Sequence, residues 1–375
     1  MPEKAKAGVL VGSRKVEVQE FDLPATGDDD ALLRIEACGI CGSDIPPYQG
    51  EIHGEVGPLP VILGHEITGR VENLGKNAAA RWGVEEGDRI ILERWLPCGS
   101  CELCRNGYYR ICRPKTPNGG ALNYGGTTIN HPPYLWGGYA DYMYLAHNSV
   151  VFKVSKDIPA EWLPLFTPIA NGISWTQRTG GAIVGSTIVI QGPGQMGQGC
   201  VIAAQEAGAR QIIVTGLTND AKRLDLAMEM GATHTIMVDE EDAVAKVKEI
   251  TEGKMADVVL DVTAGSTEPV NMAMELAGFN GTVVLAASHS GTVPNFNARE
   301  INHKMLTVKG VSGRDRNSIL VALRLIESGK YDLDKLCTHT YPVEQTDLAL
   351  ATAAREIDTG VEPIHVCVVP GHPLV

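Results

Sequence analysis

Long apolar runs are missing from this sequence of 375 residues, and their absence excludes a class of protein. A transmembrane helix needs about 20 consecutive apolar residues, and no run approaches that length. The segment from Met1 to Val18 carries several Lys and Arg residues and has no long apolar stretch of the kind found in secretory signals. We therefore expect a soluble, cytoplasmic protein.

Basic clusters are missing as well. The chain has 32 Lys and Arg against 45 Asp and Glu, a formal net charge of -13, and no cluster of Lys and Arg stands out. Nucleic acids and anionic membranes bind to basic faces, so neither is expected as a partner. Internal repeats and low-complexity segments are also absent, and 44% hydrophobic residues are enough for two globular domains.

The first part of the chain has the pattern of a β-rich domain. From Lys6 to about Leu145 it is interrupted by Gly and Pro and holds short β-rich runs, such as residues 31–36 and 89–92. Helical periodicity is scarce in this part. The pattern predicts an antiparallel, barrel-like region.

The pattern changes at about residue 186. Apolar runs typical of strands, at residues 187–190, 211–214, 257–262 and 282–286, alternate with helix-like stretches. Such alternation predicts an α/β fold with a doubly wound parallel sheet. After about residue 310 the alternation ends, and we interpret the helix-like stretch 318–328 and a final strand at 364–369 as a return to the first domain.

Four of the nine cysteines lie close together, which favours metal binding over disulfides. Cys98, Cys101, Cys104 and Cys112 have the spacing C-x2-C-x2-C-x7-C, in which four thiolates can close a tetrahedral zinc shell. An iron–sulfur cluster would need a much shorter last gap, and buried free cysteines are the other alternative. The spacing predicts a structural zinc site in a lobe of about residues 94–115.

A second group offers one thiolate, one imidazole and one carboxylate, from Cys41, His65 and Glu66. This set suits a zinc shell with an open position, which catalysis requires. Taken singly, Cys41 is more simply a small core residue and His65 a hydrogen-bonded turn residue. Together with the four-cysteine lobe, the pair favours a catalytic zinc.

A glycine-rich segment follows the strand pattern at 187–190. Gly192, Gly194 and Gly197 form G-x-G-x-x-G, with Gln195 and Met196 inside the motif and a helix-like stretch after it. In that context the glycines let a pyrophosphate approach the backbone, and the N-terminus of the helix faces its charge. A glycine-rich loop without a ligand is the alternative, but strand, turn and helix together predict a dinucleotide site.

The end of the second strand of this region bears on the choice of cofactor. A carboxylate usually stands there to bind the adenosine ribose, whereas this chain has Gly216. Thr218, Lys222 and Arg223 follow closely and can bind a 2′-phosphate, although the same segment can simply be a helix start capped at residues 219–220. The sequence predicts NAD(P) with a slight preference for NADP.

These motifs, in their order and spacing, resemble the medium-chain dehydrogenase family, and within it the branch of threonine and sorbitol dehydrogenases. The resemblance implies a GroES-like catalytic domain of residues 1–163 and 313–375, with an inserted Rossmann domain of residues 164–312. It also implies that Cys41, His65 and Glu66 surround a reactive zinc. The matching segments are residues 39–44, 60–71, 87–90, the four-cysteine lobe, 137–142 and 309–311.

The chain departs from this family at positions around the reactive metal. Relatives carry a further ligand or carboxylate in the segment that matches residues 166–172, where this chain has Thr167 and Ala170. Relatives also often have a His where this chain has Pro46, so this chain lacks that part of the usual proton path. His53 is the candidate replacement.

The resemblance implies a zinc-dependent, NAD(P)-linked oxidation of a secondary alcohol or polyol in the cleft between two domains, and aromatic pocket walls would favour a bulky or cyclic alcohol. A bound zinc lowers the cost of removing the hydroxyl proton, and Ser43 resembles the family's proton relay. Trp95 and residues 114–136 can wall the substrate pocket or equally pack a subunit contact. We expect a homo-oligomer, a dimer or tetramer. The alternatives are a zinc-free quinone or enone reductase on the same scaffold and a non-catalytic NAD(P)-binding protein.

Overall fold

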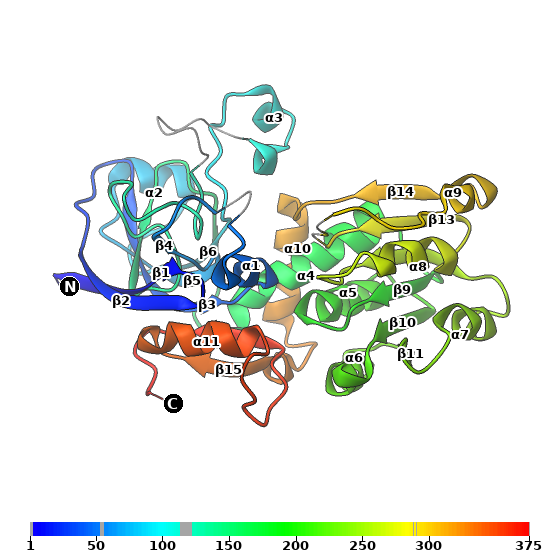
Figure 1. Ribbon diagram of the computed structural model, residues 1–375. Coiled ribbons are helices and arrows are strands. Elements are labelled where there is room, and N and C mark those ends of the chain that lie inside the picture. Colours follow the sequence, from blue (N-terminus) through cyan, green and yellow to red (C-terminus); the bar gives the residue numbers. More distant parts are fainter. Residues whose placement is uncertain (1–2, 53–55, 113–121, 288, 290, 375) are drawn as a thin grey trace. The chain divides into compact units, whose positions relative to one another are not determined.

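The computed structural model describes residues 3–52, 56–112, 122–287, 289 and 291–374. The chain divides into two units (Figure 1): unit 1 contains residues 1–165 and 332–375, and unit 2 contains residues 166–331. Among the described residues, no helix is both long enough and apolar enough to span a membrane.

One predicted boundary differs from this division. Residues 313–331 were expected in the first domain, but they lie in unit 2. The reason is α10 (Arg316–Ser328), whose buried side chains, Ile319, Ala322 and Ile326 among them, give it an apolar face, and the helix packs against α4 (Phe166–Ile173). The strand–helix alternation has already ended at this point, so the local pattern does not show to which unit the helix belongs.

Unit 1 is built on β-sheets, as predicted. Its larger sheet contains seven strands in the order β15-β16-β3-β5-β6-β8, with β7 paired to β3, and a smaller sheet has the order β2-β1-β4. All pairs are antiparallel except β15 with β16. The strands are β1 (Lys4–Gly12), β2 (Lys15–Asp22), β3 (Ala31–Gly39), β4 (Val61–Ile62), β5 (Glu66–Glu72), β6 (Arg89–Leu92), β7 (Tyr142–Leu145), β8 (Val151–Lys153), β15 (Cys337–Tyr341) and β16 (His365–Val368).

A large apolar cluster lies in the core of unit 1. Leu32, Ile67 and Ile90 come from neighbouring strands and are fully buried in it. Short helices lie between the strands along the chain. They are α1 (Ile45–Gln49), α2 (Lys76–Trp82), α3 (Glu102–Arg105) and α11 (Thr346–Ala353), with 3-10 turns at Gly42–Asp44, Tyr109–Ile111, Ala160–Leu165, Leu333–Lys335 and Val343–Gln345.

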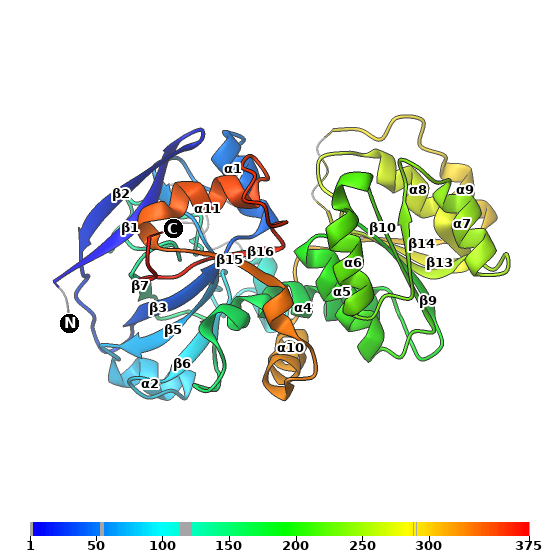
Figure 2. The ribbon, with the colours of Figure 1, turned by 90° about the horizontal axis from the view of Figure 1, so that it is seen from below.

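Unit 2 is the predicted doubly wound parallel sheet. Its six strands have the order β11-β10-β9-β12-β13-β14, and every pair is parallel. Helices α4, α5, α6 and α10 pack together on one face, and α7, α8 and α9 on the other (Figure 2). The strands are β9 (Thr187–Gln191), β10 (Gln211–Gly216), β11 (His234–Met237), β12 (Ala256–Asp261), β13 (Ala277–Leu285) and β14 (Thr307–Gly310). The other helices are α5 (Gln195–Glu206), α6 (Ala221–Glu229), α7 (Ala243–Ile250), α8 (Glu268–Leu276) and α9 (Ala298–His303), with a π-helical turn at Ser174–Thr179 and a 3-10 turn at Thr218–Asp220.

The strand order of unit 2 reverses direction at β9. Strands β10 and β11 extend the sheet on one side of β9, and β12, β13 and β14 extend it on the other. Gln191 at the end of β9 pairs with Asp261 at the end of β12. In open α/β sheets a ligand binds outside the carboxyl ends of the strands at such a switch point. The fold therefore places the glycine-rich turn where a dinucleotide site belongs.

Candidate metal and cofactor sites

The four cysteines of the predicted lobe converge on one point. Each offers a sulfur, and the four sulfurs lie within 4.8 Å of one another. The Sγ atom of Cys112 is 3.7 Å from that of Cys101 and 3.5 Å from that of Cys98. A tetrahedron of thiolates at the usual Zn–S distance of about 2.3 Å has edges of about 3.8 Å. The donor set and spacing fit a closed zinc site.

This lobe is held by local contacts and has little apolar packing of its own. Leu103, Tyr108 and Ile111 are 39%, 63% and 44% exposed. The N–H groups of Ser100 and Cys101, followed by the Ser100 hydroxyl, lower the pKa of the Cys98 thiol to about 6, which favours the thiolate that zinc requires. Residues 98–112 bury few apolar side chains, so a bound metal would add to the other contacts that fix this segment, such as the ion pair of Arg110 with Glu93 at 3.0 Å.

The second donor set lies in the core of unit 1. Cys41 follows β3, while His65 immediately precedes β5 and Glu66 begins it. Strands β3 and β5 are antiparallel, and Gly39 pairs with Glu66, so the register brings the two segments together. The three donor atoms lie within 4.8 Å of one another, and all three residues are buried. These residues supply three ligands and leave room for a fourth, as in catalytic zinc sites.

Asp44 holds the imidazole of this set. Its Oδ1 atom is 3.3 Å from His65 Nδ1, which leaves Nε2 as the ring nitrogen for a metal. Its Oδ2 atom accepts hydrogen bonds from the Tyr139 hydroxyl at 2.8 Å and from the Cys41 amide at 3.1 Å. Burial raises the pKa of Asp44, but His65 and Tyr139 outweigh it and lower the pKa. The carboxylate is thus kept ionised beside His65. The sequence reasoning assigned no role to Asp44 or Tyr139.

The charges around Cys41 call for a cation. Burial raises the pKa of the Cys41 thiol, and the carboxylates of Glu66 and Asp44 raise it further. Placing several anionic groups together in a buried site is costly unless a positive charge compensates them. A divalent metal would supply that charge and release the thiol proton as it binds. The site therefore fits zinc in its electrostatics as well as in its donors.

Ser43 lies at the same site. Its hydroxyl is 3.5 Å from His65 Nε2, and a hydrogen bond from it opposes the rise in the pKa of Cys41. The structure thus brings Ser43 together with the ligand set, as the relay interpretation requires.

Gly39 leaves the space that two other groups of this site occupy. A Cβ atom on Gly39 would lie 2.5 Å from His365 Cε1 and 2.7 Å from Glu66 Oε2. His365 comes from β16, more than 300 residues further along the chain, and is fully buried. Burial lowers its pKa to about 4, which keeps the imidazole neutral. No local pattern indicated that His365 belongs here.

The glycine-rich turn of unit 2 has the backbone that the fingerprint requires. Gly192 has φ of 103°, a conformation that favours glycine. A Cβ atom on Gly197 would collide with the Gly192 carbonyl oxygen, so only glycine fits there. Gly194 caps α5, which begins at Gln195, and the N-terminus of the helix faces the turn. Met196 Sδ is 3.5 Å from the Asn171 amide nitrogen, so its side chain packs toward α4.

The end of β10 shows one group that the sequence reasoning missed. Gly216 ends the strand as expected, but Asp239, just after β11, accepts hydrogen bonds from both the amide and the hydroxyl of Thr218. Both donors of Thr218 are therefore engaged. A carboxylate therefore lies near this strand end, and its negative charge would repel a 2′-phosphate.

The two basic residues of this segment differ in position. A Cβ atom on Gly194 would lie 3.6 Å from an Arg223 guanidinium nitrogen, so Arg223 extends to the glycine-rich turn. Lys222 is exposed on α6. Arg223 is thus the better placed of the two to meet a phosphate.

The structure describes the three positions at which the chain departs from the family pattern. Pro46 lies in α1, and Thr167 and Ala170 are buried on α4 in unit 2. His53 lies outside the described residues.

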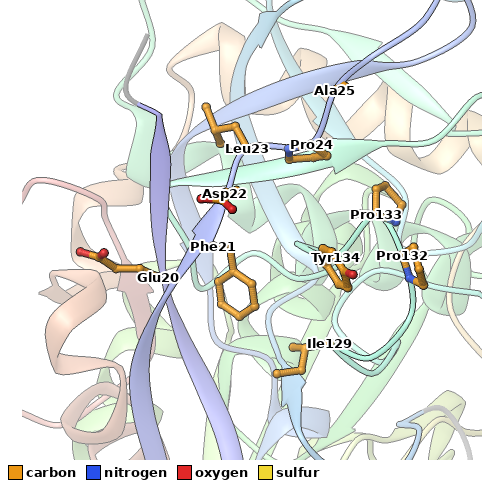
Figure 3. A pocket seen from close by; sticks show the side chains of 10 residues that line it. All are labelled: Glu20, Phe21, Asp22, Leu23, Pro24, Ala25, Ile129, Pro132, Pro133 and Tyr134. Carbon is orange, nitrogen blue, oxygen red and sulfur yellow. The ribbon is translucent and has the colours of Figure 1, made fainter.

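The aromatic segment proposed as a pocket wall is only partly described. Trp95 is buried, and Trp136 packs its ring edge-on against Tyr144 in the core of unit 1. Residues of this segment that precede Trp136 line an open surface hollow of about 550 Å³ (Figure 3), which contains none of the predicted site residues. The hollow is lined by residues 20–25, Ile129, Pro132, Pro133 and Tyr134.

Comparisons with known proteins agree with this geometry. A family model described as the alcohol dehydrogenase GroES-like domain matches residues 27–156, and one described as zinc-binding dehydrogenase matches residues 196–328. The chain belongs to the zinc-containing medium-chain alcohol dehydrogenase family. Its reaction class is NAD(P)-linked oxidation of an alcohol, and the convergence of Cys41, His65 and Glu66 argues against the zinc-free reductase.

Individual relatives match over nearly the whole chain. A probable alcohol dehydrogenase of Mycobacterium tuberculosis is 40% identical over 97% of this chain and 98% of its own length. Sorbitol dehydrogenase of Bacillus subtilis is 31% identical over 94% of each chain. A solved structure from Sinorhizobium meliloti, described as a zinc-binding dehydrogenase bound to NADP, has a TM-score of 0.83 and 26% identity, and covers 98% of this chain and 100% of its own.

Proposed function

We propose that this enzyme oxidises a secondary alcohol or polyol at a catalytic zinc held by Cys41 and His65, with Glu66 binding directly or moving in and out. The observation that carries the proposal is the buried, incomplete donor set in unit 1, with Asp44 fixing the imidazole. The similarity to a sorbitol dehydrogenase supports the polyol class. A bulky or cyclic alcohol is the second substrate class to test.

The roles of the residues follow from their positions. Cys41 and His65 would hold the metal, which when bound lowers the cost of removing the hydroxyl proton of the alcohol. Asp44 keeps the His65 ring in a fixed orientation, because it faces one ring nitrogen and leaves the other for the metal. Ser43, beside His65, would accept the substrate proton and pass it towards solvent or the cofactor ribose.

The experiment that tests this function combines metal content with a substrate screen. Purified enzyme should contain two zinc ions per chain and should reduce NAD(P)+ with polyols or secondary alcohols. A single zinc in fully active enzyme would refute the catalytic site. Activity with quinones or enones alone would support the reductase alternative.

For the cofactor we propose weak discrimination with a slight preference for NADP. Gly216 supplies no carboxylate to the ribose, and Arg223 extends to the glycine-rich turn, whereas the charge of Asp239 opposes a 2′-phosphate. An NADP-bound structural neighbour supports this preference. We propose cofactor contacts from Gly192, Gly194, Gln195, Met196, Gly197, Gly216, Thr218, Lys222 and Arg223.

Four substitutions test the cofactor proposal through kcat/KM for both cofactors. Gly216→Asp should raise the preference for NAD, and Gly216→Ala is its control, since a Cβ atom there already meets Pro193 Cγ at 3.0 Å. Asp239→Asn should improve kcat/KM for NADP.

Arg223→Ala should weaken the binding of NADP alone by about 1.5–3 kcal/mol, the usual cost of a charged hydrogen bond, and Lys222→Ala should cost less. A wild type strongly selective for NAD and unaffected by these changes would refute the proposal.

Assembly and location are further predictions. We propose a homo-oligomer, a dimer or tetramer, since most soluble oligomers are symmetric assemblies of one chain. Light scattering measures the mass directly. The predicted cytoplasmic location is tested by cell fractionation.

A further inference from the structure

A histidine and a buried aspartate form a pair at the switch point of unit 2. His289 Nε2 is 2.7 Å from Asp261 Oδ2, and Asp261 is fully buried. The other oxygen of Asp261 accepts the Thr263 amide at 3.1 Å and the Thr263 hydroxyl at 2.6 Å. We propose that this pair binds the nicotinamide half of the cofactor, with His289 Nδ1 accepting a hydrogen bond from a ribose hydroxyl and Asp261 positioning the ring.

The place of the pair in the fold is the first support. Asp261 ends β12 and pairs with Gln191, the last residue of β9, so it stands where the strand order reverses. Thr263 lies against the glycine-rich turn, because a Cβ atom on Gly192 would lie 3.2 Å from Thr263 Cγ2. The pair is therefore next to the turn that faces the pyrophosphate, at the edge of the sheet where a dinucleotide crosses.

The state of the imidazole is the second support. Asp261 Oδ1 accepts two hydrogen bonds, so the carboxylate is an acceptor and Nε2 of His289 carries the proton that it donates to Oδ2. In the neutral ring Nδ1 is then an acceptor. This Nδ1 atom is buried and has no hydrogen-bond partner among the described residues. A buried acceptor without a partner is costly, and a ligand hydroxyl would satisfy it.

The position of the pair on the sheet indicates which part of the cofactor it contacts. In this fold the adenosine ribose lies at the end of the second strand, here β10, and the pyrophosphate lies over the first turn. The other nucleotide therefore extends over β12 and β13. His289 follows β13 and is tied to the end of β12, so it faces the nicotinamide half. The nicotinamide half of the cofactor offers two kinds of hydrogen-bond donor, the ribose hydroxyls and the carboxamide. We assign the contact with His289 to a ribose hydroxyl, because the ribose adjoins the pyrophosphate.

Binding of three ligands to the zinc-loaded full-length enzyme tests the assignment. They are the reduced dinucleotide, ADP-ribose, which keeps the second ribose without nicotinamide, and ADP, which has neither. With His289→Ala, the Kd values for the dinucleotide and ADP-ribose should rise about threefold to tenfold, the effect of one neutral hydrogen bond. The Kd for ADP should not change. Asp261→Asn should shift the same two ligands, because the amide has one acceptor oxygen in place of the two that Thr263 and His289 use.

Two controls separate binding from a structural role. His303→Ala removes an exposed histidine on α9 of the same unit and should change none of the three Kd values. Equal losses for ADP and ADP-ribose in His289→Ala would show that the pair only stabilises the sheet edge, and would overturn the proposal. Loss for the dinucleotide alone would overturn the ribose assignment, and unchanged Kd values for all three ligands would refute any contact.

Discussion

The two metal sites of unit 1 are built in opposite ways. The lobe draws four thiolates from a single segment, residues 98–112, and the surrounding apolar side chains are exposed. The core site draws a thiolate, an imidazole and a carboxylate from two segments of a β-sheet, and every donor is buried. One site organises its own surroundings, whereas the other depends on a fold that is already packed around it.

This difference shows what each site can do. A closed shell of four thiolates offers no position to a substrate, so the lobe site can only stabilise structure. The core site has an incomplete shell, and its imidazole is held by Asp44, which is itself held by Tyr139. Rigid support around an open position is what a catalytic metal needs. We therefore expect that loss of the core zinc leaves the structure of the lobe intact, and that loss of the lobe zinc leaves the chemistry of the core site intact.

Removing a ligand from each site should give the largest contrast. Cys41→Ser should lower turnover by at least about 1,000-fold, since a Lewis acid contributes several kcal/mol to the transition state. It should lower the zinc content from two to one and leave cofactor binding unchanged, because that site lies in unit 2. His65→Ala should behave in the same way.

The matched change in the lobe is Cys104→Ser. It should also remove one zinc, but its main effects should be a lower unfolding temperature and faster proteolysis near residues 98–112. Metal analysis, steady-state kinetics and thermal unfolding compare the two variants. Near-normal turnover in Cys41→Ser would contradict the assignment of the core site.

Loosening the support of the core site should have a smaller effect. Asp44→Asn keeps the size of the side chain but removes the charge that faces His65 Nδ1. Losses of about 10-fold to 100-fold in activity or in zinc affinity are typical of such partners. Tyr139→Phe removes only the hydrogen bond to Asp44 and should cost less. If Tyr139→Phe cost more than Asp44→Asn, the order of support inferred here would be wrong.

Filling the space beside the core site should have the smallest effect. The added methyl of Gly39→Ala would meet His365 and Glu66, and overpacking of this kind costs about 1–3 kcal/mol. Gly42→Ala is the control, since a Cβ atom there has no neighbour within 4 Å. Chemical denaturation and zinc content measure both. If Gly39→Ala and Gly42→Ala were equally stable, His365 and Glu66 would have to shift at little cost to make room for the added methyl.

The sequence allowed prediction of features whose parts lie close together along the chain. The cysteine spacing indicated the lobe, and the strand, turn and helix around Gly192 indicated the parallel sheet and its glycine-rich turn. Both patterns depend on local geometry, so spacing alone carries them. Cys41 and His65 were suggestive only in combination, because the register of β3 and β5 brings them together.

Other features depend on contacts between distant segments. Tyr139, in the loop before β7, and His365, at the start of β16, join the core site, and Asp239, in the turn after β11, meets Thr218. No short pattern marks such partners, because only the folded sheet sets their positions. The boundary at residues 313–331 was wrong for the same reason, since packing on α4 decides where α10 belongs.

A chelator time course tests the comparison of the two sites most directly. The enzyme is incubated with a zinc chelator, and bound zinc, turnover and unfolding temperature are measured on the same samples. We predict that the first zinc leaves the core site together with all activity, while the unfolding temperature changes little. The second zinc should leave the lobe later, as the lobe unfolds. Full activity after loss of the first zinc, or simultaneous loss of both, would contradict it.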